Sequence, residues 1–110
     1  MATLNEPTLL EAARVFAQRI LREGGDVPAQ QIEFAFRTCL GRNPLPAERQ
    51  RLLALLDQQW RSFEHDLEAA EALVNVGSAP RSPGLDVRRL AAWMIVANVL
   101  LNLDETLVKG

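Results

Sequence analysis

The chain has 110 residues, of which 48% are hydrophobic, 24% charged and 5% aromatic, and its formal net charge is −2. This length and composition are those of one folded domain, residues 1–110, that buries about two-thirds of its unfolded surface. The 12 basic and 14 acidic side chains exclude the excess of positive charge typical of nucleic-acid binding, so we expect no nucleic-acid partner. The single cysteine excludes an internal disulfide framework and a multi-cysteine metal site.

Targeting and membrane signals are also missing from the sequence. The first residues contain no basic region followed by an apolar run, so they do not form a signal peptide. The longest weakly polar stretch, Leu90 to Leu103, is interrupted by Asn98 and Asn102 and is shorter than the roughly 18 apolar residues that span a bilayer. We therefore expect no membrane insertion.

The first helix is predicted from about Thr8 to Glu23. Thr8 and Glu11 have the spacing of a capping box, and Gly24 is placed to end the helix in a left-handed conformation. An apolar stripe at helical spacing comprises Leu9, Ala13, Phe16 and Ile20. The side expected to face solvent carries Arg14, Gln18 and Arg22.

A second helix is predicted to begin near Asp26, with Pro28 in its first turn, and to stop at Gly41. One apolar face comprises Ile32, Ala35, Phe36, Cys39 and Leu40. At 100° per residue Phe34 points almost opposite to that face, so we expect it to meet a second neighbour, a partner or solvent.

A third helix begins at about Pro46 and has the most regular apolar spacing in the chain. Its seam comprises Leu53, Leu56, Trp60, Phe63 and Leu67. The polar run around His65 is expected to break this helix, with Asp66 capping a short fourth helix that runs through Val74 and ends by Gly77.

The last helix is predicted from Val87 to about Asn102, capped by Asp86, after an irregular connector rich in proline and glycine, residues 78–84. It carries no charge between Arg89 and Asp104, and such a helix is buried on several sides. The predicted fold class is therefore all-α, a compact bundle of four to five helices packed around an apolar C-terminal helix. Trp60 and Trp93 are predicted in its core.

The chemically active side chains form no recognisable site. Cys39 lies on an apolar face and is predicted to be a small core residue, and His65 lies at a helix junction beside carboxylates that point in different directions. We expect Asp104 and Glu105 to pair with nearby arginines, and we expect a tertiary salt bridge at Arg88–Arg89. The sequence lacks C-x-x-C-H, G-x-G-x-x-G, a Walker loop and G-x-S-x-G, so we expect no catalytic residues, no metal and no cofactor, covalent haem included.

A series of short phrases along the chain carries a family resemblance. The phrases are Leu4-Asn5-Glu6-Pro7, Glu11-Ala12-Ala13-Arg14, Ala35-Phe36-Arg37, Leu40-Gly41-Arg42-x-Pro44, Val76-Gly77, Leu85-Asp86, Leu90-Ala91-Ala92-Trp93 and Leu100-Leu101-Asn102-Leu103-Asp104-Glu105. Over residues 3 to 109 this series resembles the C-terminal part of PSD-one, a domain of unknown function found in large planctomycete proteins associated with cytochrome c domains. The family often has aspartate where this chain has Glu6.

The resemblance implies the kind of protein from which the chain comes. It assigns no catalytic residue to this sequence. The family's proteins are large and usually exported, to the periplasm or cell surface, so we expect this chain to be a fragment or a separately encoded part of such a protein. We predict a non-catalytic structural or interaction module; the alternative is a small ligand-binding or enzymatic helical bundle. The expected partner is the rest of the parent chain or a second copy in a weak homodimer, through an interface that includes Phe34, Leu103 and Leu107.

Overall fold

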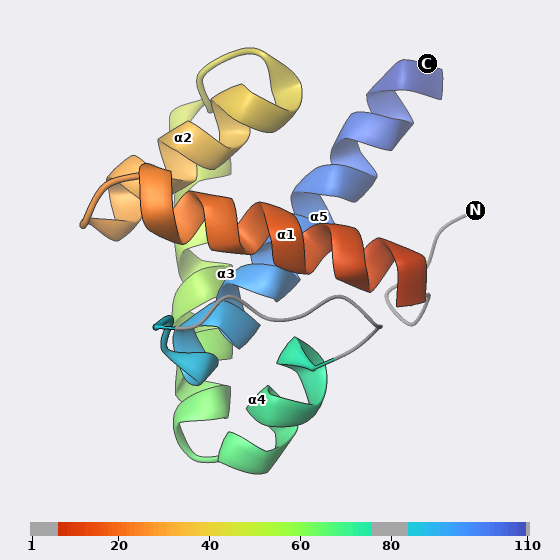
Figure 1. Ribbon diagram of the computed structural model, residues 1–110. Helices are drawn as coiled ribbons and strands as arrows, with labels where there is room; N and C mark the ends of the chain where they lie inside the picture. The colour runs from red at the N-terminus through yellow and green to blue at the C-terminus, as the bar shows by residue number, and fades with distance from the viewer. Residues whose placement is uncertain (1–6, 76–83, 110) are drawn as a thin grey trace.

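The computed structural model describes the backbone of residues 7–75 and 84–109 and the side chains of residues 10–75 and 84–103. Five helices follow one another along the chain (Figure 1). They are α1 (Pro7–Glu23), α2 (Pro28–Leu40), α3 (Pro46–Glu64), α4 (Leu67–Val74) and α5 (Val87–Lys109). The described ranges contain no strand, and the all-α prediction is confirmed.

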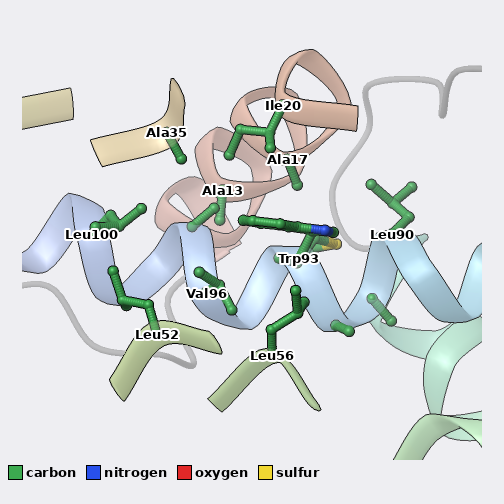
Figure 2. Packing of buried hydrophobic residues seen from close by; sticks show 14 of the residues in the cluster. Ala13, Ala17, Ile20, Ala35, Leu52, Leu56, Leu90, Trp93, Val96 and Leu100 are labelled. Carbon is green, nitrogen blue, oxygen red and sulfur yellow. The ribbon is translucent and has the colours of Figure 1, made fainter. Parts of the chain in front are cut away.

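Helix α5 runs through the middle of the molecule and packs against each of the other four helices. The buried side chains of α5 are Leu90, Ala91, Ala92, Trp93, Met94, Val96, Ala97, Asn98 and Leu100. Figure 2 shows Trp93 on the side of α5 that faces α1, and Leu52 and Leu56 reaching α5 from α3. The absence of charge in this helix therefore predicted its central position correctly.

Helix α1 crosses α5 with small side chains in the contact, and its buried face is wider than predicted. Ala13, Ala17 and Ile20 are fully buried, as the apolar stripe indicated. The prediction that Arg14 and Gln18 face solvent is wrong, because both are buried as well. Arg14 reaches the C-terminal end of α4, a contact that a single-helix pattern cannot reveal.

The turn after α1 uses two glycines for different reasons. The left-handed residue is Gly25, with φ +99°, and not Gly24 as predicted. A Cβ on Gly24 would lie 2.6 Å from the Ile20 carbonyl oxygen and 3.3 Å from the Gln31 Cα. Gly24 therefore permits the close approach of α1 and α2, and Gly25 reverses the chain.

The break between α3 and α4 lies where the sequence placed it. The Asp66 carboxylate accepts a hydrogen bond of 3.0 Å from the Ala69 N–H and so caps α4. Leu56 and Phe63 are buried as predicted, but Leu67 is 42% exposed. The prediction for Leu67 is wrong because the helical register of the α3 seam ends at His65 and does not continue into α4.

Helix α5 begins as predicted, with the Asp86 carboxylate accepting a 2.9 Å hydrogen bond from the Arg88 N–H. It continues to Lys109, seven residues beyond the predicted end near Asn102. Asp104 and Glu105 are therefore helical, and their predicted ion pairs lie outside the described side chains, as does the Thr8–Glu11 capping box. Among the described residues, no helix is long and apolar enough to cross a bilayer.

Candidate functional site: a cleft between α2, α3 and α5

A half-open cleft lies where the first turn of α2, the middle of α3 and the first half of α5 meet. Its volume is about 330 Å³, and each helix contributes side chains about one turn apart. The lining residues are Pro28, Gln31, Leu53, Leu56, Asp57, Trp60, Arg89, Ala92 and Trp93. The short loop between α2 and α3 joins the C-terminal end of α2 to the N-terminal end of α3, and both of these ends lie away from the cleft. The first turn of α2 therefore lies beside the middle of α3.

The floor of the cleft is apolar. Trp93, Leu56 and Ala92 are almost completely buried, and they belong to the same hydrophobic cluster as the rest of the core. Trp60 and Leu53 are only partly buried and form one wall. The prediction that Trp93 is a core residue is confirmed, whereas Trp60 lies at the edge of the core and borders this opening.

The polar lining consists of three side chains with separate partners. Gln31 is buried and donates a 2.9 Å hydrogen bond from Nε2 to the Gly25 carbonyl, which ties α2 to the turn after α1. The Asp57 carboxylate is 3.1 Å from the Nε of Arg61. The guanidinium of Arg89 lies 6.0 Å from the centre of the Trp60 ring, at the outer limit of a cation–π contact.

Arg89 has no acidic partner within hydrogen-bonding distance among the described residues. The tertiary salt bridge predicted for Arg88–Arg89 is therefore not found in that part of the chain. Both α2 and α5 begin beside the cleft, and the N-terminal ends of helices carry partial positive charge. Carboxylates already lie at both ends, because Asp86 caps α5 and Asp26 comes two residues before α2, so the positive charge on this rim is that of Arg89.

A second hollow lies on the other side of Gln31 and Arg89, which line both spaces. Its volume is about 360 Å³, and it is bordered by Asp26 and Asp86. Asp86 already accepts the Arg88 N–H at the start of α5. The two side chains of Gln31 and Arg89 thus separate an apolar cleft from a more acidic hollow.

The structure does not bring the side chains singled out in the sequence into this cleft. Phe34 is half-buried on α2, with the Arg19 guanidinium 5.6 Å from its ring centre, and Leu103 is 43% exposed on α5. Leu107 lies outside the described side chains. Cys39 is half-buried and donates to the Leu100 carbonyl over 3.3 Å, and His65 is exposed.

The lining residues that the sequence analysis missed are Gln31 and Asp57. Gln31 lies four residues before Ala35 and therefore on the apolar face of α2. A polar residue on an apolar face is a feature by which the sequence could have identified it as a candidate site residue. Asp57 lies four residues after Leu53 on the α3 seam and gives a similar signal. Their convergence depends on how three helices pack together, which no single helical pattern contains.

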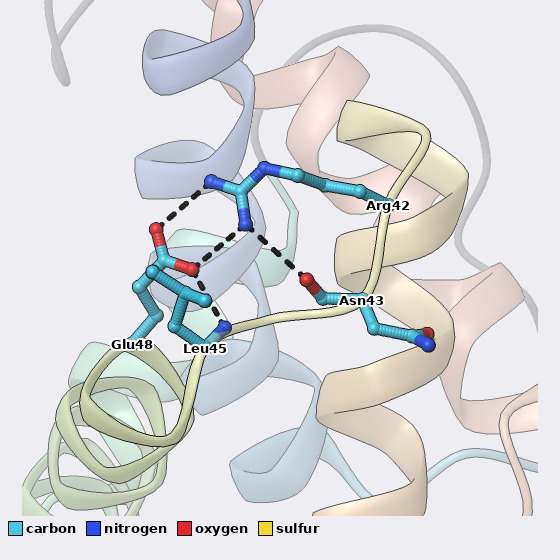
Figure 3. Close-up of polar contacts among 4 residues, drawn as sticks. All are labelled: Arg42, Asn43, Leu45 and Glu48. Atoms are coloured by element: carbon cyan, nitrogen blue, oxygen red, sulfur yellow. Dashed lines mark hydrogen bonds and ion pairs between the residues drawn. The ribbon is translucent and has the colours of Figure 1, made fainter.

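Ionisable side chains interact most strongly in the turn between α2 and α3, away from the cleft. Arg42 donates to both carboxylate oxygens of Glu48, over 2.9 and 3.0 Å, and the Leu45 N–H donates to the same carboxylate over 2.8 Å (Figure 3). These hydrogen bonds, with that from Arg42 the stronger, lower the pKa of Glu48 to about 2. The pair fixes the N-terminal end of α3, and the Arg42 guanidinium also lies 4.8 Å from the centre of the Phe36 ring.

No group of three or more His, Cys, Asp or Glu side chains within the described ranges is arranged to hold a metal ion. A family profile described as PSD1, protein of unknown function (DUF1553), matches residues 1–56, about half of the chain. This match supports the recognition made from the sequence, over a shorter span than residues 3 to 109. Searches of curated proteins and of solved structures found no match.

Proposed function

The chain belongs to the PSD1 family of proteins of unknown function, and we propose that it is a non-catalytic interaction module that binds a protein segment in the cleft between α2, α3 and α5. The observation that carries the proposal is a cleft of about 330 Å³ whose partly exposed apolar wall, Trp60 and Leu53, lies above the buried side chains of Trp93, Leu56 and Ala92. An apolar concavity with a few polar groups at its rim is typical of a recognition site.

The rest of the parent protein is one source of such a segment. The resemblance to large, exported, cytochrome c-associated planctomycete proteins supports a module that packs against a neighbouring part of the same chain. A second copy of this chain is the alternative partner, and it would associate through a different surface that includes Phe34, Leu103 and Leu107; Phe34 and Leu103 do not line the cleft. We retain both as proposals, and they predict different oligomeric states of the isolated chain.

A small ligand-binding bundle remains the second candidate, because the same cleft lies near the lower end of the roughly 300–1,000 Å³ of ligand pockets. Catalysis has less support. Among the residues that the structure describes, Asp57 and Arg89 are the only ionisable ones that line the cleft, and Asp57 is paired with Arg61. This lining offers no pair of carboxylates for general acid–base chemistry.

The test is a selection of displayed peptides against the wild-type chain, followed by a comparison of two variants. Leu53→Glu places a charge on the wall of the cleft, whereas Ala54→Glu places the same charge on an exposed neighbour that does not line it. We expect the selected peptides to lose binding to Leu53→Glu and to keep it with Ala54→Glu. A selection that yields only peptides insensitive to Leu53→Glu contradicts the proposed site.

A further inference from the structure

We propose that the segment bound in this cleft presents one large apolar side chain, aromatic or aliphatic, directly beside a single carboxylate. The inference rests on the proposed function and adds the chemistry of the partner. It depends on three features of the described residues: the size of the cleft, the free guanidinium of Arg89, and the positions of the neighbouring acidic groups.

The size of the cleft limits its occupant. At about 330 Å³ and half open to solvent, it has room for one large side chain together with part of the group beside it. Trp60 and Leu53 on α3 are only partly buried and offer apolar surface to that side chain. An aromatic guest would gain from ring contacts in addition to the burial of its apolar surface.

Arg89 determines which charge the bound segment carries next to its apolar side chain. Its guanidinium lies near the Trp60 ring and has no carboxylate partner among the described residues, so a ligand carboxylate displaces no existing ion pair. The planar guanidinium can donate two parallel hydrogen bonds to a carboxylate. The other charged lining residue, Asp57, is held by Arg61 at 3.1 Å, which reduces its repulsion of an incoming anion.

The hollow beyond Arg89 limits the number of negative charges that the bound segment can carry. Asp26 and Asp86 border that hollow and would repel a second carboxylate that extended past Arg89. The site is therefore suited to one acidic residue adjacent to an apolar one, and a run of acidic residues fits it poorly. This arrangement distinguishes the proposal from general attraction between an acidic peptide and a basic surface.

The experiment uses two capped tetrapeptides that differ in one group, Gly-Phe-Asp-Gly and Gly-Phe-Asn-Gly, titrated into the full chain. Binding is followed by NMR through the indole N–H signals of Trp60 and Trp93 and the backbone signals of Arg89. We expect both peptides to shift the Trp60 signal, with the aspartate peptide binding about tenfold more tightly, equivalent to about 1.4 kcal/mol. Gly-Phe-Asp-Asp-Gly should show no further gain.

Arg89→Gln should bring the aspartate peptide to the affinity of the asparagine peptide and leave the latter unchanged. Because Arg89 is exposed, this variant is expected to fold, and the unchanged binding of the asparagine peptide verifies that it has. Arg51→Gln removes an equal charge from an exposed position on α3 that does not line the cleft, and it should preserve the tenfold preference.

Three outcomes overturn the proposal in distinguishable ways. Equal binding of the two peptides to wild type contradicts the role of Arg89 but leaves the cleft as a protein-binding site. Failure of both peptides to shift the Trp60 or Arg89 signals at millimolar concentration contradicts the inference and the proposed function together. Tighter binding of free N-acetylphenylalanine than of either peptide assigns the site to a small carboxylate and not to a protein segment.

Discussion

The Nη1 of Arg14 donates a 2.8 Å hydrogen bond to the Val74 carbonyl, joining two residues that are 60 positions apart in the chain. Arg14 is only 1% exposed, and Val74 is fully buried. The last carbonyls of a helix have no partner within it, and α4 has no basic residue in its own last turn. Arg14 therefore supplies from α1 both the donor and the positive charge that favour the C-terminal end of α4.

Replacing this arginine should destabilise the fold. Arg14→Met keeps most of the aliphatic volume but leaves the buried Val74 carbonyl without this donor, which we expect to lower the free energy of unfolding by about 1–3 kcal/mol. Urea denaturation followed by circular dichroism measures the change. Arg22→Met on the exposed side of α1 is the control, with an expected change within about 0.5 kcal/mol. Equal effects of the two substitutions would show that the buried hydrogen bond contributes no stability.

The Arg14 contact also shows where reasoning from the sequence stops. The apolar stripe of α1 predicted the burial of Ala13 and Ile20, because that stripe depends only on helical periodicity. Arg14 lies beside the same stripe, and its burial depends on the presence of the α4 end nearby. Sequence periodicity identifies the face of a helix, but it does not identify which other helix end that face will meet.

The same distinction applies to the cleft. The central place of α5 and the core position of Trp93 could be predicted, because an uncharged helix must be covered on several sides. The seam of α3 correctly included Leu53, Leu56 and Trp60, but it did not reveal that Trp60 would remain partly open. That outcome requires the relative positions of three helices. Gln31 and Asp57 became site residues only through this packing.

The two tryptophans should differ in their contribution to stability. Trp93 is 1% exposed within the core, so Trp93→Ala is expected to cost about 3–5 kcal/mol, enough to unfold a marginal domain. Trp60 is partly exposed at the cleft, so Trp60→Ala should cost clearly less. Denaturant titrations of both variants measure the difference. A loss below about 1 kcal/mol for Trp93→Ala would contradict its place in the core.

The Arg42–Glu48 pair predicts a dependence of stability on acid pH. Glu48 has a pKa of about 2 in the folded chain, below its ordinary value of 4.5, so the folded state favours the ionised carboxylate. Its contribution to stability is therefore fully present above about pH 4.5 and is lost as the pH falls through 2. We expect the difference in melting temperature between wild type and Glu48→Gln to shrink over this interval.

Salt provides the control for this pH effect. Because Arg42 is exposed and Glu48 partly exposed, high ionic strength should weaken the attraction between their charges and reduce the difference between wild type and Glu48→Gln at pH 7. Thermal melts at low and high salt test this expectation. A difference between the two proteins that is the same at pH 7 and at pH 2 would contradict a stabilising role for the Glu48 carboxylate.

Self-association of the isolated chain is the last prediction. Phe34 is half-buried on α2, and burial of an apolar side chain in an interface favours association by about 1.5–3 kcal/mol when the burial is complete. We propose that a surface including Phe34 supports a weak homodimer, so Phe34→Glu should shift the chain toward monomer. Light scattering across a concentration series measures the shift. Leu67→Glu on α4, at the opposite end of the molecule from α2, is the matched control and should leave the dimer intact (Figure 1). A wild-type chain that stays monomeric at every concentration would contradict this interface and would leave the rest of the parent protein as the expected partner.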